Sequence, residues 1–451
     1  MRDLTQGSVT RTIISMATPV AAGMIFQTLY LLVDLFFVAA IGDDAVAGVG
    51  AGGTLMFMIM ALTQILGVSA VAMISQAVGR KDQPEANLVF NQSLVVSMIF
   101  AVVTCIAGYL TAEVYLATIT SDEGALREGV TFLYYFLPSM ALQFPLMAMA
   151  SSLRATGLVK PGMVVQVLTV VLNTILAPIL IAGWGPGPAL GVMGAGLASS
   201  ISVFIGVLML TYYFVKLEKY VSFETILWRP RFDIWKRMFA IGLPAGGEML
   251  LLFVYFSAVY WLIADFGAAA QAGFSIGGRI MQSIFMPTMA IAFALGPIAG
   301  QNYGAKRFDR VRETCSKGIL LSSIVMAVVT ILMQWKSDLM IGFFTEELEV
   351  IEVGSVFLQL ISLNFIAQGI VFSCSGMFQG LGNTRPAMLS STVRILVFLP
   401  LAVYLKYQPG FTITQVWWVS ILSVTTQAVV SYLLVRREFR KRLDIEPVAA
   451  L

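Results

Sequence analysis

The stretch RATGLVKPGM, residues 154–163, returns in altered form 225 residues later as QGLGNTRPAM, residues 379–388. The same offset, without gaps, holds over most of each half: Pro19 with Pro244, Tyr30 with Tyr255, Gln76 with Gln301 and Gln143 with Gln368. Chance does not preserve one offset over so long a distance. We therefore infer that the chain consists of two duplicated halves.

The composition restricts what each half can be. Of the 451 residues, 58% are apolar and only 12% are charged, whereas soluble domains carry about 25% charged residues. The apolar runs are too long and too continuous for the short alternating strands of a membrane barrel. The sequence thus predicts an all-α, polytopic membrane protein.

Apolar runs of about 20 residues or more predict twelve transmembrane spans, six in each half. Because six is even, both halves enter the membrane in the same direction, and their pseudo-two-fold axis runs along the membrane normal. We predict a lobe at 1–215, a cytoplasmic linker at 216–237, a second lobe at 238–437 and a cytoplasmic tail at 438–451. The spans are placed at 12–41, 47–78, 88–112, 127–153, 162–182, 190–215, 238–264, 270–303, 314–335, 351–381, 387–406 and 413–435.

The positive charges predict the orientation. With the N-terminus inside, 23 of the 28 Lys and Arg residues fall in cytoplasmic segments and three in outer segments. Cytoplasmic segments of membrane proteins carry this excess of Lys and Arg. We expect a multi-pass protein of the inner (plasma) membrane with both termini cytoplasmic.

The residue inventory excludes several chemistries. There is no histidine, and the three cysteines lack the spacing of a metal site or a disulfide framework. No catalytic cluster is visible, so we expect neither an enzyme nor a cofactor. Any proton handling must use Asp or Glu.

Asp34 lies in an otherwise uncharged run of the first span, about 12 Å below its outer end at about 1.5 Å per residue. Burying a carboxylate in a bilayer costs about 2.5–3.5 kcal/mol on insertion scales, and intramembrane acids mark ion pathways by default. Tyr30 and Gln27 precede Asp34 on the same helical face. The offset pairs Asp34 with Val259, so the coupling ion, a proton or Na⁺, is expected in the first lobe only. The alternative is a carboxyl that is merely satisfied by a partner.

Pro19 lies about two turns into the same span and should kink it. The kink is equally consistent with a static bend and with a hinge that responds to the charge of Asp34.

The second lobe carries its own intramembrane charges. Glu248, whose repeat counterpart is Gly23, lies at a depth similar to that of Arg394. An ion pair would lower the cost of both charges, with Arg279 as a rival partner. We favour a structural pair, and substrate contact is the alternative.

Amides form the remaining polar positions within the spans. Asn173 lies in the fifth span, and Asn364 and Gln368 share one face of the tenth. Such amides either line a cavity, together with Tyr255, or hold helices together.

The motifs GMFQGLGNTRPAM (376–388), LYLLVDLFFVAAIG (29–42), LNTILAPILI (172–181) and GLPAGGE (242–248) give the chain a family resemblance. Over essentially its whole length the chain resembles the MATE family, the multidrug and toxic compound extrusion transporters, and in particular their DinF-like prokaryotic branch. The resemblance implies twelve spans in two lobes and a drug antiporter driven by Na⁺ or H⁺.

The resemblance also assigns roles to residues. It implies that Asp34, with Tyr30 and Asn173, binds the coupling ion. The family pattern carries a second acid where this chain has Ala177. This departure weakens a Na⁺ site and favours protons, so no metal is expected unless Na⁺ binds at Asp34.

The function expected from these observations is export of small amphiphilic, often cationic compounds by a monomer that alternates access across the bilayer. The cavity candidates are Gln27, Glu248, Tyr255, Arg279, Asn364, Gln368 and Arg394. A flippase for lipid-linked oligosaccharides is the alternative, although it usually needs a more basic cavity. Nothing in the sequence points to nucleic acid.

Overall fold

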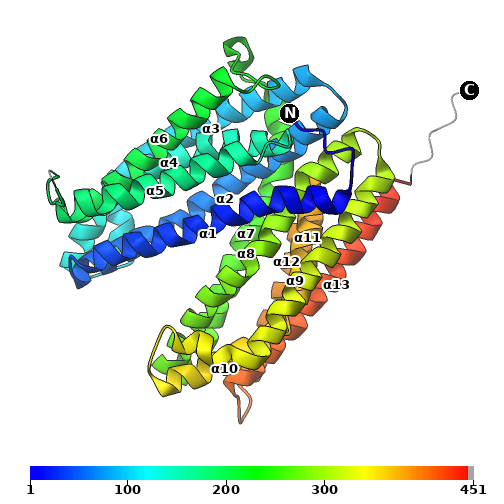
Figure 1. Ribbon diagram of the computed structural model, residues 1–451. Coiled ribbons are helices and arrows are strands. Elements are labelled where there is room, and N and C mark those ends of the chain that lie inside the picture. Colours follow the sequence, from blue (N-terminus) through cyan, green and yellow to red (C-terminus); the bar gives the residue numbers. More distant parts are fainter. Residues whose placement is uncertain (186, 445–451) are drawn as a thin grey trace, which may run out of the picture. The chain divides into compact units, whose positions relative to one another are not determined.

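The computed structural model describes residues 1–185 and 187–444, except for the side chains of residues 29–35, 54 and 57. The described chain is helical and contains no strand, as the composition predicts (Figure 1). Its α-helices are α1 (Val9–Ala39), α2 (Asp43–Gly79), α3 (Gln83–Ala117), α4 (Glu123–Ala155), α5 (Lys160–Ala182), α6 (Val192–Lys216), α7 (Phe232–Ile263), α8 (Ala268–Gly304), α9 (Phe308–Gly342), α10 (Leu348–Ser362), α11 (Phe365–Gly380), α12 (Arg385–Lys406) and α13 (Ile413–Arg442). Two short 3₁₀ segments, η1 (Thr225–Trp228) and η2 (Ala264–Phe266), stand before and after α7.

Eleven of these helices are, within the described chain, long and apolar enough to cross a membrane. The tenth predicted span, 351–381, is not one helix: α10 and α11 are bent by 55° at Leu363 and Asn364. Many helices extend beyond the predicted bounds because polar turns continue the helix past the apolar run.

The chain divides into two compact units, and their bounds differ from those of the predicted lobes. Unit 1 comprises Met1–Asp3 and Ala22–Gly242, and unit 2 comprises Leu4–Ala21 and Leu243–Leu451. Hydrogen bonds between segments far apart in the sequence explain both differences. In unit 2, Gln301 and Asn302 bond the backbone of Leu4.

The predicted linker belongs to unit 1 for a similar reason. The amide of Gln92 on α3 donates to the carbonyls of Leu227 and Arg229 at 2.5 and 2.9 Å. Asn91, one residue earlier, donates to the carbonyl of Ser222 at 2.9 Å. The segment before α7 is therefore fastened to α3 along most of its length.

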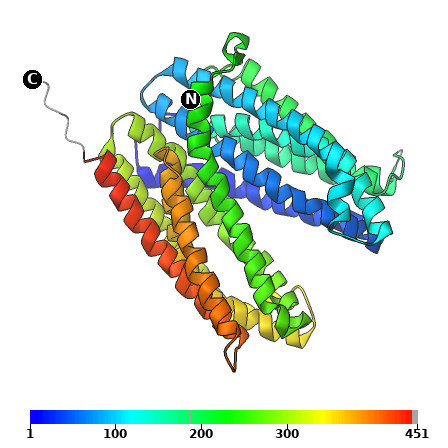
Figure 2. The same cartoon turned by 180° about the vertical axis from the view of Figure 1, so that it is seen from behind.

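Helix packing repeats between the two units. In unit 1, α4 packs against α2, α3 and α6, and α5 packs against α6. In unit 2, α11 packs against α8, α9 and α13, and α12 lies beside α13 (Figure 2). These pairs correspond under the offset of 225 residues, so the sequence duplication is a duplication of structure.

Close helix contacts recur at matched glycines. A Cβ on Gly48 would lie 2.5 Å from the backbone nitrogen of Gly129, and a Cβ on Gly273 would lie 3.0 Å from the nitrogen of Gly354. Both pairs are related by the same offset. Helices in lipid associate through close packing rather than through hydrophobic burial from water, so small residues at such contacts matter.

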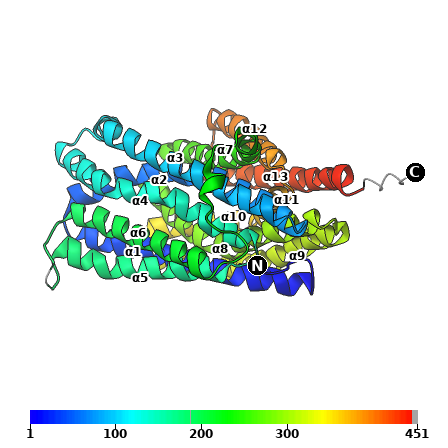
Figure 3. The ribbon, with the colours of Figure 1, turned by 90° about the horizontal axis from the view of Figure 1, so that it is seen from above.

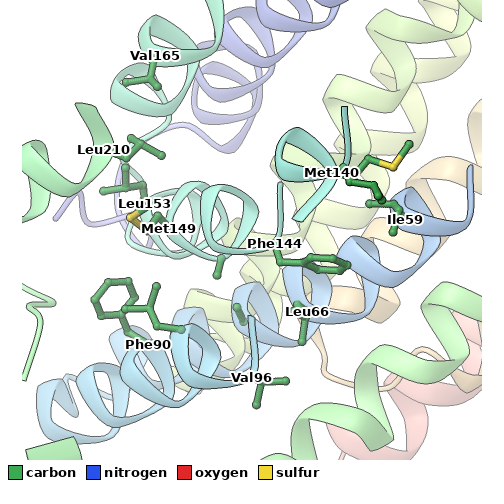
Figure 4. Close-up of a cluster of buried hydrophobic side chains, with 14 of the residues drawn as sticks. Ile59, Leu66, Phe90, Val96, Met140, Phe144, Met149, Leu153, Val165 and Leu210 are labelled. Atoms are coloured by element: carbon green, nitrogen blue, oxygen red, sulfur yellow. The ribbon is translucent and has the colours of Figure 1, made fainter. Parts of the chain in front are cut away.

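The core of unit 1 lies between α2, α3 and α4. Leu66, Phe90 and Phe144 are fully or almost fully buried there, and Figure 4 shows Phe144 between Ile59 and Leu66. Phe144 also meets Phe100 edge to face at 5.5 Å. This packing fixes α4, which contains the proline described next.

A proline within a helix of unit 1 and the helix bend of unit 2 occupy corresponding positions. Pro138 in α4 corresponds by the offset to Leu363 at the α10–α11 bend. A proline frees the carbonyl four residues before it, and Tyr109 of α3 donates to this carbonyl, that of Tyr134, at 2.9 Å.

The break in unit 2 is stabilised in the corresponding way without a proline. Leu363 and Asn364 bond the carbonyls of Leu360 and Ile361, three residues back rather than four, which frees the carbonyl of Gln359. Gln334 of α9 donates to the carbonyl of Gln359 at 2.6 Å, and Thr330 donates to that of Ser362 at 2.9 Å. Gln334 and Gln359 are the counterparts of Tyr109 and Tyr134, so the hydrogen bond recurs with different side chains.

Candidate functional site

The predicted ion-coupling residues of the first span lie within helix α1. The backbone of Tyr30 and Asp34 is helical, as predicted. Their side chains lie outside the described residues, so their predicted roles stay predictions. The neighbouring side chains on α5 are described and define the surroundings.

Gln27, one turn before Tyr30, is exposed and bonds α5. Its Oε1 accepts a hydrogen bond from Gln166 at 3.1 Å. A Cβ at Gly23 would lie 2.8 Å from Oε1 of Gln166. The absence of a side chain at Gly23 therefore allows this amide to reach α1. Gln166 is a polar residue inside an apolar run that the sequence analysis overlooked.

Asn173, two turns further along α5, is fully buried. Its Nδ2 donates to Ser199 of α6 at 3.2 Å, while its Oδ1 has no hydrogen-bond partner among the described atoms. A buried acceptor without a partner is costly. The site thus offers one free, fully buried amide oxygen.

Ala177 lies one turn beyond Asn173 and is also fully buried. Its methyl group occupies the position at which the resemblance places a second acid. A carboxylate ligand is missing from this part of α5, as its sequence indicates.

Pro19 is half-buried within α1, and α1 continues through it as a helix. The two compact units divide the helix between Ala21 and Ala22, less than one turn away. Its counterpart Pro244 in α7 lies beside the division between Gly242 and Leu243. A proline thus accompanies both places where a helix passes from one unit to the other, and whether Pro19 is a hinge stays a prediction.

The predicted ion pair between Glu248 and Arg394 is wrong. No ion pair joins these described side chains, and Oε2 of Glu248 instead accepts a hydrogen bond from Ser375 of α11 at 3.0 Å. Arg279, the rival partner, is exposed on α8 and does not pair with Glu248. A neutral hydroxyl replaces the cation because α11, rather than α12, supplies the facing side chain.

Arg394 is held by an aromatic ring and an amide. Its guanidinium carbon lies 3.8 Å from the ring centroid of Tyr255, and its Nη1 lies 3.4 Å from Oε1 of Gln368. The Tyr255 hydroxyl in turn shares a hydrogen bond of 2.6 Å with Ser420 of α13. A cation over an aromatic face gains about 0.5–2 kcal/mol, more when water is excluded.

The tenth-span amides lie at the helix bend and one turn after it. Asn364 caps α11 at the bend, is 3% exposed, and its Oδ1 has no partner among the described atoms. Gln368 lies one turn later and faces Arg394. Unit 2 thus contains a polar cluster of Tyr255, Gln368, Arg394 and Ser420, with a separate Glu248–Ser375 pair.

Sequence reasoning did not identify the hydroxyl partners. Ser199, Ser375 and Ser420 each bond a candidate residue from another helix. Serine is common in packed membrane helices, so no pattern distinguished these three.

Comparison with known proteins places the chain among membrane transporters. The family model MatE matches residues 19–179 and 244–404. The chain is 25% identical over 418 residues to "Probable multidrug resistance protein YoeA" of Bacillus subtilis, which covers 91% of this chain and 90% of the relative. It is 24% identical over 433 residues to the multidrug export protein MepA of Staphylococcus aureus, with coverage of 95% and 93%.

Solved structures agree on the fold. A transporter of the MOP superfamily from Pyrococcus furiosus superposes with a TM-score of 0.91 at 23% identity, covering 98% of each chain. The outward-facing conformation of a multidrug resistance MATE family transporter gives 0.90 at 23% identity, covering 97% of this chain and 98% of its own. The two matched ranges of the family model are also related by the offset of 225 residues.

Proposed function

Because the chain belongs to the MatE family, we propose that it exports amphiphilic, often cationic drugs in exchange for protons by alternating access. The observation that carries this proposal is the match of the family model over both halves. Full-length similarity to relatives named as multidrug export proteins supports the drug substrates. A transporter of this family is not an enzyme.

We propose that the coupling ion binds at Asp34, together with Tyr30, which lies one helical turn earlier on α1, and Asn173 of α5. The free Oδ1 of buried Asn173 supports this proposal, because it can accept a hydrogen bond from a protonated carboxyl or coordinate a cation. The buried methyl group of Ala177 favours H⁺ over Na⁺. Na⁺ needs several oxygen ligands, while a proton needs only a carboxyl and one acceptor.

Substrate contact in unit 2 is proposed for Glu248. Its carboxylate has a hydroxyl partner and no ion pair among the described residues, so its charge remains available to a cationic ligand. The remaining cavity candidates are Gln27, Arg279, Asn364 and the polar cluster around Arg394. The flippase alternative loses support because Tyr255 and Gln368 already engage Arg394, one of two intramembrane cations available for a pyrophosphate.

We further propose an inner-membrane location with both termini cytoplasmic, and a monomeric state with no cofactor. The distribution of Lys and Arg supports the orientation.

The test is ethidium efflux from proteoliposomes under an imposed pH gradient or an imposed Na⁺ gradient. We expect the pH gradient to drive efflux in the parent and Asp34→Asn to abolish it. Asp338→Asn, which removes an exposed carboxyl from α9, is the matched control and should transport as the parent does. Transport by Asp34→Asn at the parent's rate under both gradients would refute the coupling role.

A further inference from the structure

An apolar groove runs along the outside of unit 1 between α5 and α6, which lie side by side (Figures 1 and 3). Its volume is about 590 Å³. The lining residues are Lys160, Pro161, Val164, Val165, Ile205 and Leu208, followed by Met209, Tyr212, Tyr213 and Leu217. None of them belongs to the candidate sites described above.

The groove has the length of one membrane leaflet. Along α6 its lining runs from Ile205 to Leu217, a separation of twelve residue steps, or about 18 Å at about 1.5 Å per step. Half of a hydrocarbon core of about 30 Å is about 15 Å. Under the proposed orientation, the groove extends from the cytoplasmic surface to about the bilayer midplane.

The groove walls are exposed in the described part of the chain. Val164, Leu208 and Leu217 are 46, 50 and 61% exposed. A volume of this size falls within the range of small-molecule pockets. Its lining suits a hydrocarbon chain because no charged group lies below the mouth.

The mouth of the groove is cationic. Lys160 begins α5 and lines the groove, and Lys216 ends α6 next to Leu217. Both lysines are exposed and neither has an ion-pair partner in the described chain. The nearest acid in sequence, Glu218, is buried and accepts a hydrogen bond from the Tyr220 backbone at 2.9 Å.

Tyr212 and Tyr213 lie one turn before the end of α6, at the depth where aromatic side chains favour the membrane interface. Basic pockets between membrane helices on the cytoplasmic side bind anionic lipid head groups. We propose that the α5–α6 groove is a binding site for an anionic phospholipid of the inner leaflet, with its phosphate at Lys160 and one acyl chain along α6. The assignment to the inner leaflet rests on the orientation proposed above, whereas the groove itself does not depend on the transport function.

The test measures lipid retention by the purified full chain with native mass spectrometry. Phosphatidylglycerol and phosphatidylcholine with identical acyl chains are the probes. We expect phosphatidylglycerol to be retained about fivefold more strongly than phosphatidylcholine, the preference that one lysine near a phosphate supplies.

Two variants separate the head group from the acyl chain. Lys160→Gln should remove most of the preference, and Leu208→Trp, which fills the groove from an exposed position, should reduce retention of both lipids. Lys441→Gln removes an exposed cytoplasmic-side lysine from α13 and is the matched control.

Equal retention of both lipids by the parent would overturn the proposal. So would retention of phosphatidylglycerol by Lys160→Gln and Leu208→Trp at the parent's level. Displacement of the lipid by ethidium would reassign the groove to a drug. Because lipid retention is measured without transport, failure of this proposal is distinguishable from failure of the proposed antiport.

Discussion

A glutamine of α9 donates two hydrogen bonds to the bend between α10 and α11, and removing its side-chain amide should destabilise unit 2. Gln334 lies on α9, and its Nε2 donates to the carbonyl of Gln359 at 2.6 Å and to Oγ of Ser362 at 2.8 Å. Neither Leu363 nor Asn364 is a glycine or proline, so the local sequence does not break the helix by itself. The substitution Gln334→Met keeps the length of the side chain and removes the donor.

The magnitude follows from which hydrogen bonds remain after the substitution. The carbonyl of Gln359 keeps a second donor, because Oγ of Ser362 also donates to it at 2.7 Å. Thr330 still donates to the carbonyl of Ser362 at 2.9 Å. The loss is therefore that of the hydrogen bonds made by Gln334 itself, and one such bond contributes about 0.5–1.5 kcal/mol net. Measured hydrogen bonds between membrane helices average about 0.6 kcal/mol, which sets the lower end. We therefore expect Gln334→Met to lower the free energy of unfolding by about 0.6–1.5 kcal/mol.

The assay is equilibrium unfolding of the purified protein in mixed detergent micelles, followed by tryptophan fluorescence. Gln408→Met makes the same chemical change at an exposed position after α12, outside the bend, and it should leave the free energy of unfolding within about 0.5 kcal/mol of the parent's. Tyr109→Phe removes the corresponding donor in unit 1. Because Tyr109 and Gln334 share no partner, their effects should add. A Gln334→Met protein as stable as Gln408→Met would refute the role given to this side chain.

Three further predictions concern single positions. Gly48→Ala should lower stability by about 1–3 kcal/mol in detergent unfolding, because its Cβ would lie 2.5 Å from the Gly129 nitrogen, whereas Gly50→Ala meets nothing within 4 Å and should be tolerated. Lys306→Gly should raise the free energy of unfolding by up to about 1 kcal/mol, because Lys306 has a φ of 57° in the turn after α8, where glycine has no steric cost. An unchanged or lowered free energy of unfolding would contradict this. Glu248→Gln keeps an acceptor for Ser375 and removes the charge. It should therefore raise the KM for ethidium several-fold and leave the KM for a neutral substrate unchanged. An equal change in KM for both substrates would exclude a charge contact.

The sequence predicts the spans well because long apolar runs report membrane helices directly. It does not predict the bend at Leu363 in the same way, since neither proline nor glycine marks it. The repeat did contain a signal: Leu363 corresponds to Pro138, a proline within α4 that removes a backbone hydrogen bond at the matching position.

The allocation of α1 and α7 to the units was beyond the reach of hydropathy. Hydrogen bonds from Gln301 and Asn302 to Leu4 tie the start of the chain to unit 2. Such bonds join residues about 300 positions apart, and apolar periodicity carries no information about them. The partner of Glu248 was missed for a related reason, because one serine among many in the packed helices supplies it.

The two halves share backbone features that the fold requires, whereas they differ in their intramembrane charges. The hydrogen bond to the corresponding backbone carbonyl is kept while proline becomes leucine and the tyrosine donor becomes glutamine. The left-handed turn after the second span of each half keeps Lys81 and Lys306, with φ values of 61° and 57°. A geometric requirement can be met by several side chains, so duplication preserves it through substitution.

Charges behave differently. Asp34 corresponds to Val259 and Glu248 to Gly23, so each half carries one intramembrane acid at a position where the other half has none. Each acid is costly in a bilayer, and neither is required by the shared fold, since the corresponding helix forms without it. We infer that each acid is retained, despite its cost in the bilayer, for a function of its own lobe. This asymmetry is the reason to assign ion coupling to Asp34 and substrate contact to Glu248 rather than one shared role to both.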